Sequence, residues 1–149
     1  MTLKTGAGRS VRVEGHPGPA ATVVKHIDAR GLARTWRLRR ARAEFAVQQA
    51  LFAAGVSVPE PLELRTDANG LELVSRYLAD ARSLHELERG PPRAHAWCAR
   101  AARHIGELVA RAHAVGLDHP DLHEKNVLVT GEAQPYLIDF AGARVRGRF

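Results

Sequence analysis

The sequence contains very little cysteine and no long apolar segment. Its 149 residues include one cysteine, Cys98, which excludes an intrachain disulfide and a cysteine-based zinc site, and suits a reducing compartment. No apolar stretch approaches the roughly 18 residues that a membrane-spanning helix needs. The segment MTLKTGAGRSVRVEG at residues 1–15 has no apolar core of the kind found in secretory signals. We therefore expect a cytoplasmic location.

Positive charge exceeds negative charge in this chain. There are 22 Lys and Arg residues against 16 Asp and Glu residues, which gives a net charge of +6 at pH 7. Such a balance favours anionic partners, namely nucleotide phosphates, nucleic acid or an anionic membrane face. The hydrophobic content of 45% is enough for a folded core. Composition does not choose among the partners, so that choice depends on motifs.

The first half of the chain is predicted to form strands around one helix. Apolar and polar residues alternate over 9–14, and residues 22–27 are mainly β-branched and apolar. Both patterns predict a strand. Apolar residues at helical spacing predict a helix over about 33–54 that ends at Gly55. Two more strands are expected around a hairpin turn at 66–70. The apolar positions of the expected helix are Trp36, Leu38, Ala41, Phe45, Leu51 and Phe52.

The second half of the chain is expected to be mainly helical. A short helix follows a connector, and a long helix is predicted over about 94–115, with Gly116 after it. The neighbours of Cys98 predict that this cysteine is buried on the long helix. Short strands at 127–129 and 136–138 are expected to form a hairpin. The apolar stripe of the long helix comprises Trp97, Ala101, Ile105, Leu108 and Ala112.

Three polar residues follow the long helix at fixed intervals in the stretch HPDLHEKNVLVTGEAQPYLIDF. Asp121 lies in the loop after the helix, Asn126 comes five residues later, and Asp139 follows after thirteen more. A hairpin would bring Asn126 and Asp139 side by side. Two such oxygen ligands suit Mg²⁺ bound to a polyphosphate. Asp121 is then available to accept a proton from an attacking hydroxyl group.

The order H-P-D-L-H-E-K-N followed by D-F-A resembles the catalytic loop and metal-binding motif of the protein-kinase-like superfamily. The closest similarity is to the bacterial lipopolysaccharide kinase (Kdo/WaaP) family. The resemblance implies an α+β, protein-kinase-like fold in one domain: a β-rich N-lobe at about 1–76, a connector at 77–82 and a shortened helical C-lobe at 83–149. It also implies ATP and Mg²⁺ as ligands, with Asp121, Lys25 and Asn126 catalytic and with Asn126 and Asp139 on the metal.

The resemblance extends to the first half of the chain. A kinase needs a strand lysine for the nucleotide phosphates and a helix glutamate that holds it. Lys25 and Glu44, nineteen residues apart, match that pattern. The segment TGAGRSVRV matches the phosphate-covering glycine loop in part. The resemblance therefore implies nucleotide contacts for Gly6, Gly8 and Val13, besides Lys25 and Glu44.

The resemblance also bears on the acceptor. His123 stands where protein Ser/Thr kinases usually carry lysine, and this form is similar to small-molecule and lipid-sugar kinases. The implied acceptor is a hydroxyl group of a lipopolysaccharide-core sugar. The arginine-rich start of the first helix, ARTWRLRRAR at 33–42, is most simply a solvated face. It would also suit a peripheral contact with an anionic membrane at the inner face.

Three features depart from the kinase pattern. Pro120 replaces the usual Arg or Gly beside the catalytic Asp, and Ala141 replaces the Gly of D-F-G. Alanine adopts positive φ only at a cost, so a restricted loop is expected after Asp139. The chain ends ten residues after Asp139, whereas a complete kinase C-lobe has further helices. Either the member is minimal, or part of the protein lies outside this chain.

Other functions stay open from the sequence. An atypical Ser/Thr protein kinase or an antibiotic-type phosphotransferase would use the same residues on another acceptor. A nucleotide-binding pseudokinase acting through a partner is favoured by the early end of the chain and the incomplete glycine loop. Against it stand the intact kinase residues Lys25, Glu44, Asp121, Asn126 and Asp139. Nucleic-acid binding rests on charge alone and has no supporting motif, so it is not expected.

Overall fold

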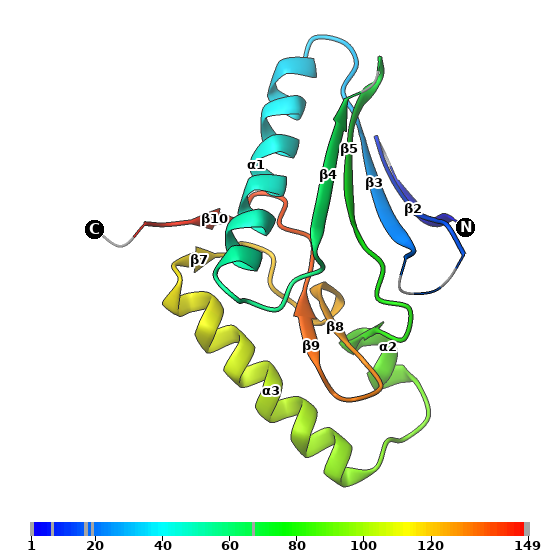
Figure 1. Cartoon of the computed structure of the whole chain (residues 1–149), viewed down its shortest axis with the longest axis vertical. Coiled ribbons are helices and arrows are strands. Elements are labelled where there is room, and N and C mark those ends of the chain that lie inside the picture. Colours follow the sequence, from blue (N-terminus) through cyan, green and yellow to red (C-terminus); the bar gives the residue numbers. More distant parts are fainter. Residues whose placement is uncertain (1, 7, 17, 19, 67, 148–149) are drawn as a thin grey trace.

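The first part of the chain forms a five-stranded antiparallel sheet with one long helix beside it (Figure 1). This computed structural model describes residues 2–6, 8–16, 18, 20–66 and 68–147. The strand order is β1-β2-β3-β5-β4, so consecutive strands pair except where the chain crosses from β3 to β4. The strands are β1 (Thr2–Gly6), β2 (Arg9–Glu14), β3 (Thr22–Asp28), β4 (Pro61–Thr66) and β5 (Gly70–Arg76).

Helix α1 (Arg34–Ala53) packs against one face of this sheet. Ala41 and Phe45 on the helix form an apolar cluster with Ile27, Leu71 and Leu73 on β3 and β5. Burying leucine, isoleucine or phenylalanine side chains stabilises a fold by about 1.5–3 kcal/mol each. The strands and the helix expected in this half are therefore confirmed, and the apolar spacing correctly placed Ala41 and Phe45 in the core.

Two residues expected on the apolar stripe of α1 lie outside the core. The exposed fraction is 60% for Trp36 and 46% for Phe52. Trp36 precedes Phe45 by nine residues, which places it half a turn away around the helix. The buried face also rotates along α1, because Leu51 near its end belongs to a second core and leaves Phe52 outside. The prediction was wrong for these two positions.

The second part of the chain is built on helix α3 and a short hairpin. Strands β8 and β9 pair with each other and β6 joins β8, while β10 pairs with β7. Residues 77–81 connect β5 to β6. The elements are β6 (Arg82–Ser83), α2 (Leu84–Arg89), α3 (His95–Ala114), β7 (Leu117–Asp118), η1 (Glu124–Asn126), β8 (Val127–Val129), β9 (Pro135–Leu137) and β10 (Arg144–Val145).

A shared core joins the two parts. Val47 and Leu51 from α1 belong to the same buried cluster as Leu108 on α3, Leu137 on β9 and Phe140. The stripe expected on α3 faces this cluster, with Trp97 and Ile105 partly buried at its edge. The helices and strands expected in this half are confirmed, whereas the division into lobes at 77–82 stays a proposal. No helix in the described ranges is long and apolar enough to cross a membrane.

Cys98 is exposed, not buried as its neighbours suggested. It lies in the first turn of α3, where residues 91–100 are exposed except for Trp97. One residue along a helix turns a side chain by about 100°. Trp97 therefore reaches the core, and donates its indole N–H to the Gly131 carbonyl at 2.8 Å, while Cys98 faces solvent.

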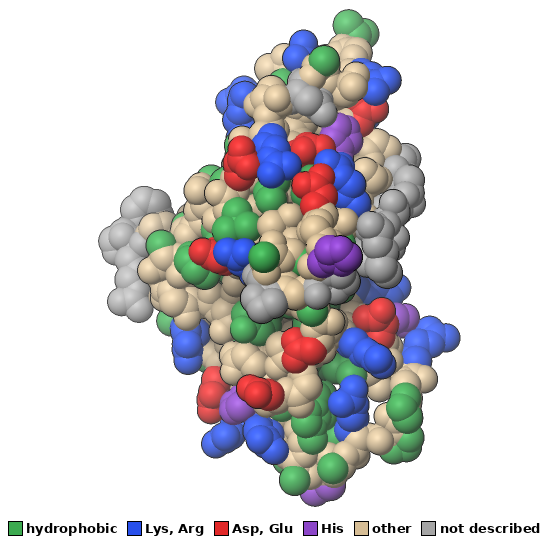
Figure 2. All heavy atoms as spheres, turned by 45° about the vertical axis from the view of Figure 1, so that its right-hand side comes forward, with side chains coloured by type: hydrophobic (Ala, Val, Ile, Leu, Met, Phe, Trp, Pro, Cys, Tyr) green, Lys and Arg blue, Asp and Glu red, His purple; other side chains and the backbone are tan. Residues whose placement is uncertain are grey.

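The outer face of the sheet carries a network of opposite charges. Arg12 pairs with Glu14 at 2.8 Å and with Glu72 at 2.7 Å, and Arg65 pairs with Glu14 at 3.3 Å. The hydrogen bond from Arg12 lowers the pKa of Glu14. Acidic and basic side chains are interleaved on the face that Figure 2 turns to the viewer. The arginines on this face are therefore neutralised by their neighbours.

Gly116 lies where the two ends of the segment that carries Asp121 and Asp139 are held together. It has a φ of +86°, and a Cβ added there would lie 2.2 Å from the carbonyl oxygen of Arg146. That close approach allows Arg146 to donate its N–H to the Gly116 carbonyl at 2.9 Å. The contact continues the pairing of β7 with β10. Only glycine adopts this positive φ without strain and also leaves room for the Arg146 carbonyl oxygen.

Replacing Gly116 by alanine should destabilise the fold. The added Cβ meets the backbone of Arg146 and adopts an unfavourable φ, so we expect the free energy of unfolding to fall by roughly 1–3 kcal/mol. Gly106→Ala is the matched control, because Gly106 lies within α3 with no atom within 4 Å of an added Cβ. This control should gain about 0.5–1 kcal/mol. Urea denaturation measures both, and a neutral Gly116→Ala would contradict the close contact.

Candidate active site

Lys25 connects three elements of the fold. Across the sheet it stands opposite Val11 on β2 and Leu73 on β5, on the face that α1 covers. Its Nζ lies 2.5 Å from Oε1 of Glu44 on α1 and 2.6 Å from Oδ1 of Asp139, just after β9. The structure thus brings Lys25 and Glu44 together as the sequence indicated, and adds Asp139 to the same group.

The environment of Asp139 keeps its side chain ionised. Burial by itself would raise the pKa of this carboxyl group. The charge and hydrogen bond of Lys25, the charge of Arg9 and an N–H of Ala141 outweigh burial, so that the pKa lies below its usual value. Asp139 also has a φ of +61°, an uncommon conformation for a residue other than glycine. The site therefore holds a fixed carboxylate beside the lysine.

Ala141 does not have the positive φ that the D-F-G comparison suggested. Positive φ occurs instead at Asp139 and at Gly142, which has a φ of +84°. The turn after Asp139 therefore places its glycine one residue later than the D-F-G motif does. The substitution at Ala141 costs no backbone strain in this arrangement.

The β8–β9 hairpin brings Asn126 close to Asp139. Ile138, the residue before Asp139, donates its N–H to the Asn126 carbonyl at 3.0 Å. The Asn126 side chain is buried, and its amide nitrogen donates to the backbone carbonyl of Asp121 at 2.8 Å. This bond leaves the amide oxygen of Asn126 as the atom able to bind a cation. Asn126 therefore links the loop of Asp121 to the hairpin of Asp139.

The carboxylate of Asp121 faces solvent, with 70% of its side chain exposed. His119 accepts the Asp121 backbone N–H on Nδ1 at 3.3 Å, and its ring lies 5.7 Å from that of Phe140. The Nε2 atom of His123 lies 3.5 Å from Oδ2 of Asp121. The loop is thus held by its backbone and by His119, while the carboxylate stays accessible to a substrate.

The glycine segment lies at the end of the strand that carries Lys25. Gly6 ends β1 opposite Arg9, and Gly8 has a φ of +73°. The Gly8 carbonyl accepts the N–H of Asp28 at 2.9 Å. Val13 is buried on β2 opposite Val23, and so shares a face of the sheet with Lys25.

The donor set fits a magnesium ion shared with a phosphate. The described part of the chain holds no group of three or more His, Cys, Asp and Glu side chains that could bind a metal ion. Asp139 and Asn126 each offer a side-chain oxygen donor, and the backbone bond between Ile138 and Asn126 holds the two residues near each other on the hairpin. Mg²⁺ usually takes one or two protein oxygens and completes its shell with phosphate and water. These two residues would therefore hold Mg²⁺ only together with a phosphate ligand.

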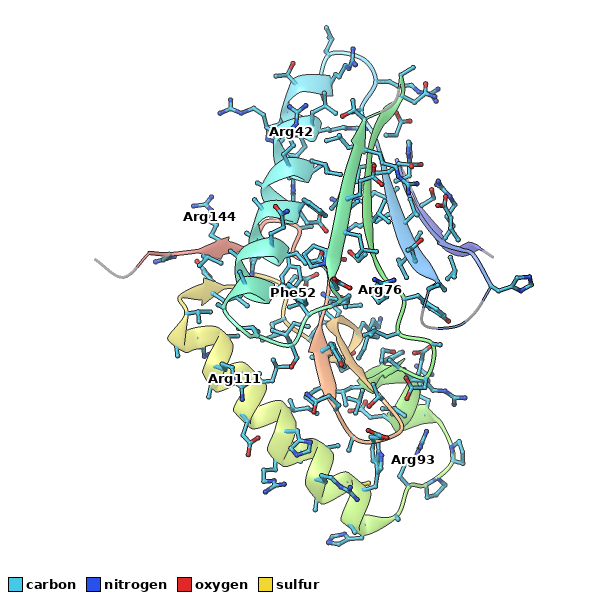
Figure 3. All side chains as sticks on the ribbon, in the orientation of Figure 1. Arg42, Phe52, Arg76, Arg93, Arg111 and Arg144 are labelled. Atoms are coloured by element: carbon cyan, nitrogen blue, oxygen red, sulfur yellow. The ribbon has the colours of Figure 1, made fainter. Side chains whose placement is uncertain are left out.

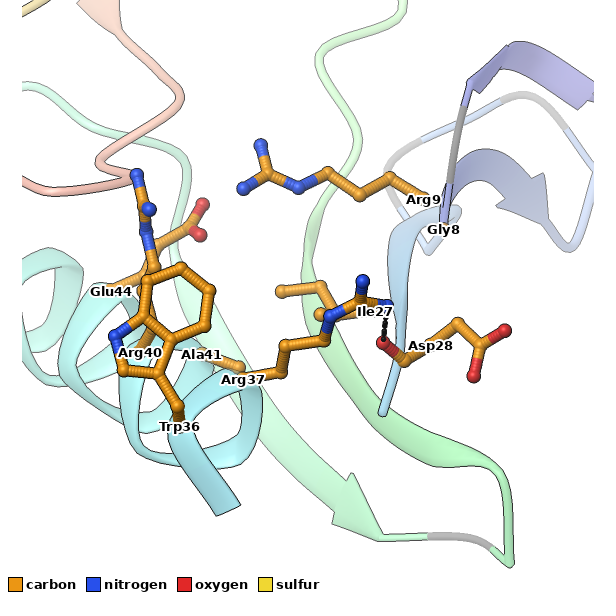
Figure 4. Close-up of a pocket in the computed structure, with 9 residues that line it drawn as sticks. All are labelled: Gly8, Arg9, Ile27, Asp28, Trp36, Arg37, Arg40, Ala41 and Glu44. Atoms are coloured by element: carbon orange, nitrogen blue, oxygen red, sulfur yellow. Dashed lines mark hydrogen bonds between the residues drawn. The ribbon is translucent and has the colours of Figure 1, made fainter. Parts of the chain in front are cut away.

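Several residues beside this site were not predicted to belong to it. A cavity of about 190 Å³ is lined by Arg9, Trp36, Arg37, Arg40 and Glu44, among others (Figure 4). Arg37, Arg40 and Glu44 are spaced three and four residues apart, which places them on one face of α1. That spacing was the available signal. The signal is weak, because a run of arginines on a helix usually faces solvent.

A family model described as a RIO domain matches residues 13–145 of the chain. The matched span contains Lys25, Glu44, Asp121, Asn126 and Asp139, while Gly6 and Gly8 precede it. RIO domains are protein-kinase-like. The match therefore covers the constellation described above and most of the chain.

The chain is also similar to curated proteins named 3-deoxy-D-manno-octulosonic acid kinase. It is 32% identical to one from Vibrio vulnificus (strain YJ016) over 111 residues, 72% of this chain and 45% of that protein. It is 32% identical to one from Stenotrophomonas maltophilia (strain R551-3) over 140 residues, 85% of this chain and 54% of the relative. With one from Xanthomonas oryzae pv. oryzae (strain PXO99A) the identity is 35% over 105 residues, 68% of this chain and 40% of the relative.

These matches confirm the predicted resemblance to the protein-kinase-like superfamily, close to the Kdo kinases, and the predicted kinase-like α+β fold. They also support the prediction of a kinase. The chain spans about half the length of the curated relatives it matches. The roles of the individual residues stay predictions.

Removing the charge of Lys25 should destabilise the fold through Glu44. In Lys25→Met the Glu44 side chain, of which 5% is exposed, becomes a buried carboxylate without its partner. Breaking a buried ion pair in this way costs about 3–5 kcal/mol, and we expect a loss near the lower end of that range. Urea denaturation at pH 7 measures it. The double variant Lys25→Met/Glu44→Leu should recover most of the loss, whereas an equally unstable double variant would assign the effect to packing.

The acid sensitivity of the fold should depend on Asp139. Its pKa in the folded state is lower than the ordinary value of 3.8, so its ionised form stabilises the fold above pH 3.8. That stability is lost as the pH falls through the lowered pKa. We therefore expect the free energy of unfolding to fall less steeply below pH 3.8 in Asp139→Asn than in the wild-type chain. Denaturation curves between pH 2 and 7 test this, and parallel pH profiles would contradict the lowered pKa.

Proposed function

Since the chain belongs to the RIO family of the protein-kinase-like superfamily, we propose that it transfers the γ-phosphate of ATP to a hydroxyl group. One observation carries the proposal: Lys25 contacts both Glu44 and Asp139. Three groups thus meet at one point. They are a cation for the phosphates, a carboxylate that holds this cation, and a carboxylate for a metal. These are the groups that phosphoryl transfer requires, since that reaction depends on positioning and charge stabilisation.

Each residue has a distinct role in this proposal. Lys25 binds the phosphates of ATP and Glu44 fixes its position. Asn126 and Asp139 hold Mg²⁺, which neutralises charge on the phosphates when it is bound. Asp121 orients the acceptor hydroxyl and accepts its proton as the new P–O bond forms. Its exposure suits that role, because the acceptor must reach the carboxylate from solvent.

The first strands would supply the remaining nucleotide contacts. The backbone at Gly6 and Gly8 approaches the phosphates without interference from side chains. Val13 contributes an apolar surface for the base, on the same face of the sheet as Lys25. These roles follow the kinase pattern, and the turn at Gly8 supports them because it ends next to β3.

We propose a sugar acid as the acceptor. The relatives described above are named for the kinase reaction of 3-deoxy-D-manno-octulosonic acid, which by its name carries a carboxyl group. A hydroxyl group of such a sugar in a lipopolysaccharide core would be phosphorylated. The presence of His123, in place of the lysine usual in protein kinases, also favours a small acceptor.

Nucleotide binding and transfer should respond differently to substitution. Calorimetry should detect Mg²⁺-dependent binding of ATP by the wild-type chain, weakened at least about tenfold in Lys25→Ala and Asp139→Ala through the loss of charged hydrogen bonds. Asp121→Asn should bind ATP as the wild type does. Its transfer of labelled phosphate to the sugar acid should fall by about 10²–10⁴-fold, the contribution typical of general base catalysis.

Two results would overturn this assignment. One is a folded wild-type chain, with normal circular dichroism, that binds no ATP in the presence of Mg²⁺. The other is an Asp121→Asn variant that transfers phosphate at the wild-type rate. Asp118→Asn is a suitable control, because Asp118 pairs with Arg146 away from the phosphate-binding group. Its transfer rate should stay unchanged.

A further inference from the structure

The polar cavity of Figure 4 opens beside the Lys25 group. Arg9 enters it from the turn after Gly8, and Trp36, Arg37 and Arg40 enter it from the first turns of α1 (Figure 4). The guanidinium groups of Arg9 and Arg40 both lie toward the side where the Glu44 carboxylate is drawn. The cavity therefore shares Glu44 with the proposed active site, and its other charged lining residues are three arginines and Asp28.

These arginines are less neutralised than those on the outer face of the sheet. Among the described residues, no carboxylate lies within ion-pair distance of Arg9, Arg37 or Arg40. Arg37 donates to the backbone carbonyl of Asp28 at 3.2 Å, and Arg40 lies 5.3 Å from the centre of the Trp36 ring. The Asp28 carboxylate points away from the cavity in Figure 4 and pairs with an arginine outside it. The cavity thus holds excess positive charge.

Arg40, which lines the cavity, lies near the loop that carries Asp121. A Cβ added to Gly142 would lie 3.5 Å from Nη2 of Arg40 and 3.6 Å from Cγ of Pro120. Pro120 directly precedes Asp121. The guanidinium of Arg40 and the ring of Pro120 therefore both lie close to Gly142. A molecule held by Arg40 could extend toward the Asp121 carboxylate.

We propose that this cavity binds the carboxylate of the acceptor sugar, so that Arg37 and Arg40 position the hydroxyl that receives the phosphate. The inference rests on the proposed function. Guanidinium groups suit carboxylates because their N–H donors form paired, charge-assisted hydrogen bonds. Trp36, which is 60% exposed, offers an apolar ring for the C–H face of the sugar. The packing of the core does not explain why Trp36 is exposed, whereas contact with a sugar does.

The size of the cavity favours an acceptor group over a nucleotide. Its volume is about 190 Å³, below the roughly 300–1,000 Å³ of sites that enclose a drug-sized ligand. It is lined by Glu44 but not by Lys25, Asp121, Asn126 or Asp139. A single charged group with part of a sugar fits such a space, while the nucleotide phosphates belong to Lys25.

The test compares an acid with its neutral ester. Free 3-deoxy-D-manno-octulosonic acid and its methyl ester carry the same hydroxyl groups, but only the acid is charged. Binding of each to the 149-residue chain is measured without ATP by calorimetry, and by the fluorescence of Trp36 in a Trp97→Phe background. The variants are Arg37→Gln and Arg40→Gln. Arg42→Gln is the matched control, an exposed arginine on the same helix that does not line the cavity (Figure 3).

The expected result is selective loss of the acid. Arg37→Gln and Arg40→Gln should each weaken binding of the acid about tenfold or more, the effect of losing one charged hydrogen bond. Arg42→Gln should bind it normally, and the ester should bind weakly to every variant. In transfer assays the KM for the acid should rise while the KM for ATP stays constant. Equal binding of acid and ester, or a rise in the KM for ATP alone, would overturn the proposal.

If the proposed function fails, the results differ from those expected if only the carboxylate site fails. The wild-type chain would then transfer no phosphate to the acid, yet inorganic phosphate should still raise its melting temperature and should do so less in Arg37→Gln and Arg40→Gln. A wild-type chain that responds to neither the acid nor phosphate would overturn the cavity as an anion site. Circular dichroism of every variant separates these outcomes from loss of folding.

Discussion

The ammonium group of Lys25 is the contact on which the arrangement of the site depends. The sheet and α1 shield this group from water, and a buried charge is stable only where it is paired and hydrogen-bonded. Two carboxylates meet that need, Glu44 from α1 and Asp139 from the end of the hairpin. The pairing therefore fixes the helix against the sheet and the hairpin against both. A site built this way positions its charges before any ligand arrives, which is the condition for effective electrostatic catalysis.

The positions of the site residues in the chain could be predicted because each depends on local structure. Asn126 and Asp139 flank a short hairpin, so strand pairing alone brings them together. Lys25 and Glu44 follow from a strand and a helix in sequence, and α1 ends close to where Gly55 indicated. The direct contact of Lys25 with Asp139 spans 114 residues. No local pattern indicates such a contact, since it depends on how the hairpin packs against the sheet.

Exposure was harder to predict than secondary structure. Trp36, Phe52 and Cys98 all fall in helices that were correctly expected, but each is more exposed than its apolar character suggested. The angle around the helix explains the exposure of Trp36 and Cys98, but helical spacing does not show what covers a side chain, which decides the exposure of Phe52. Leu51 of α1 faces the core shared with α3, whereas the first turns of both helices have little packed against them. An apolar residue at such an end is exposed unless another element reaches it.

The distribution of charge separates binding surface from structural surface. The net charge of +6 does not reveal where cations are needed. On the outer sheet face Arg12 and Arg65 are paired with glutamates from other strands of the sheet, so their charge is balanced within the fold. At the start of α1, Arg37 and Arg40 contact a carbonyl and an aromatic ring instead. Such contacts hold a guanidinium in place without cancelling its charge. A cation that is positioned but not neutralised is what an anionic ligand requires, and in this chain one such cation, Arg40, lies near the proposed catalytic loop.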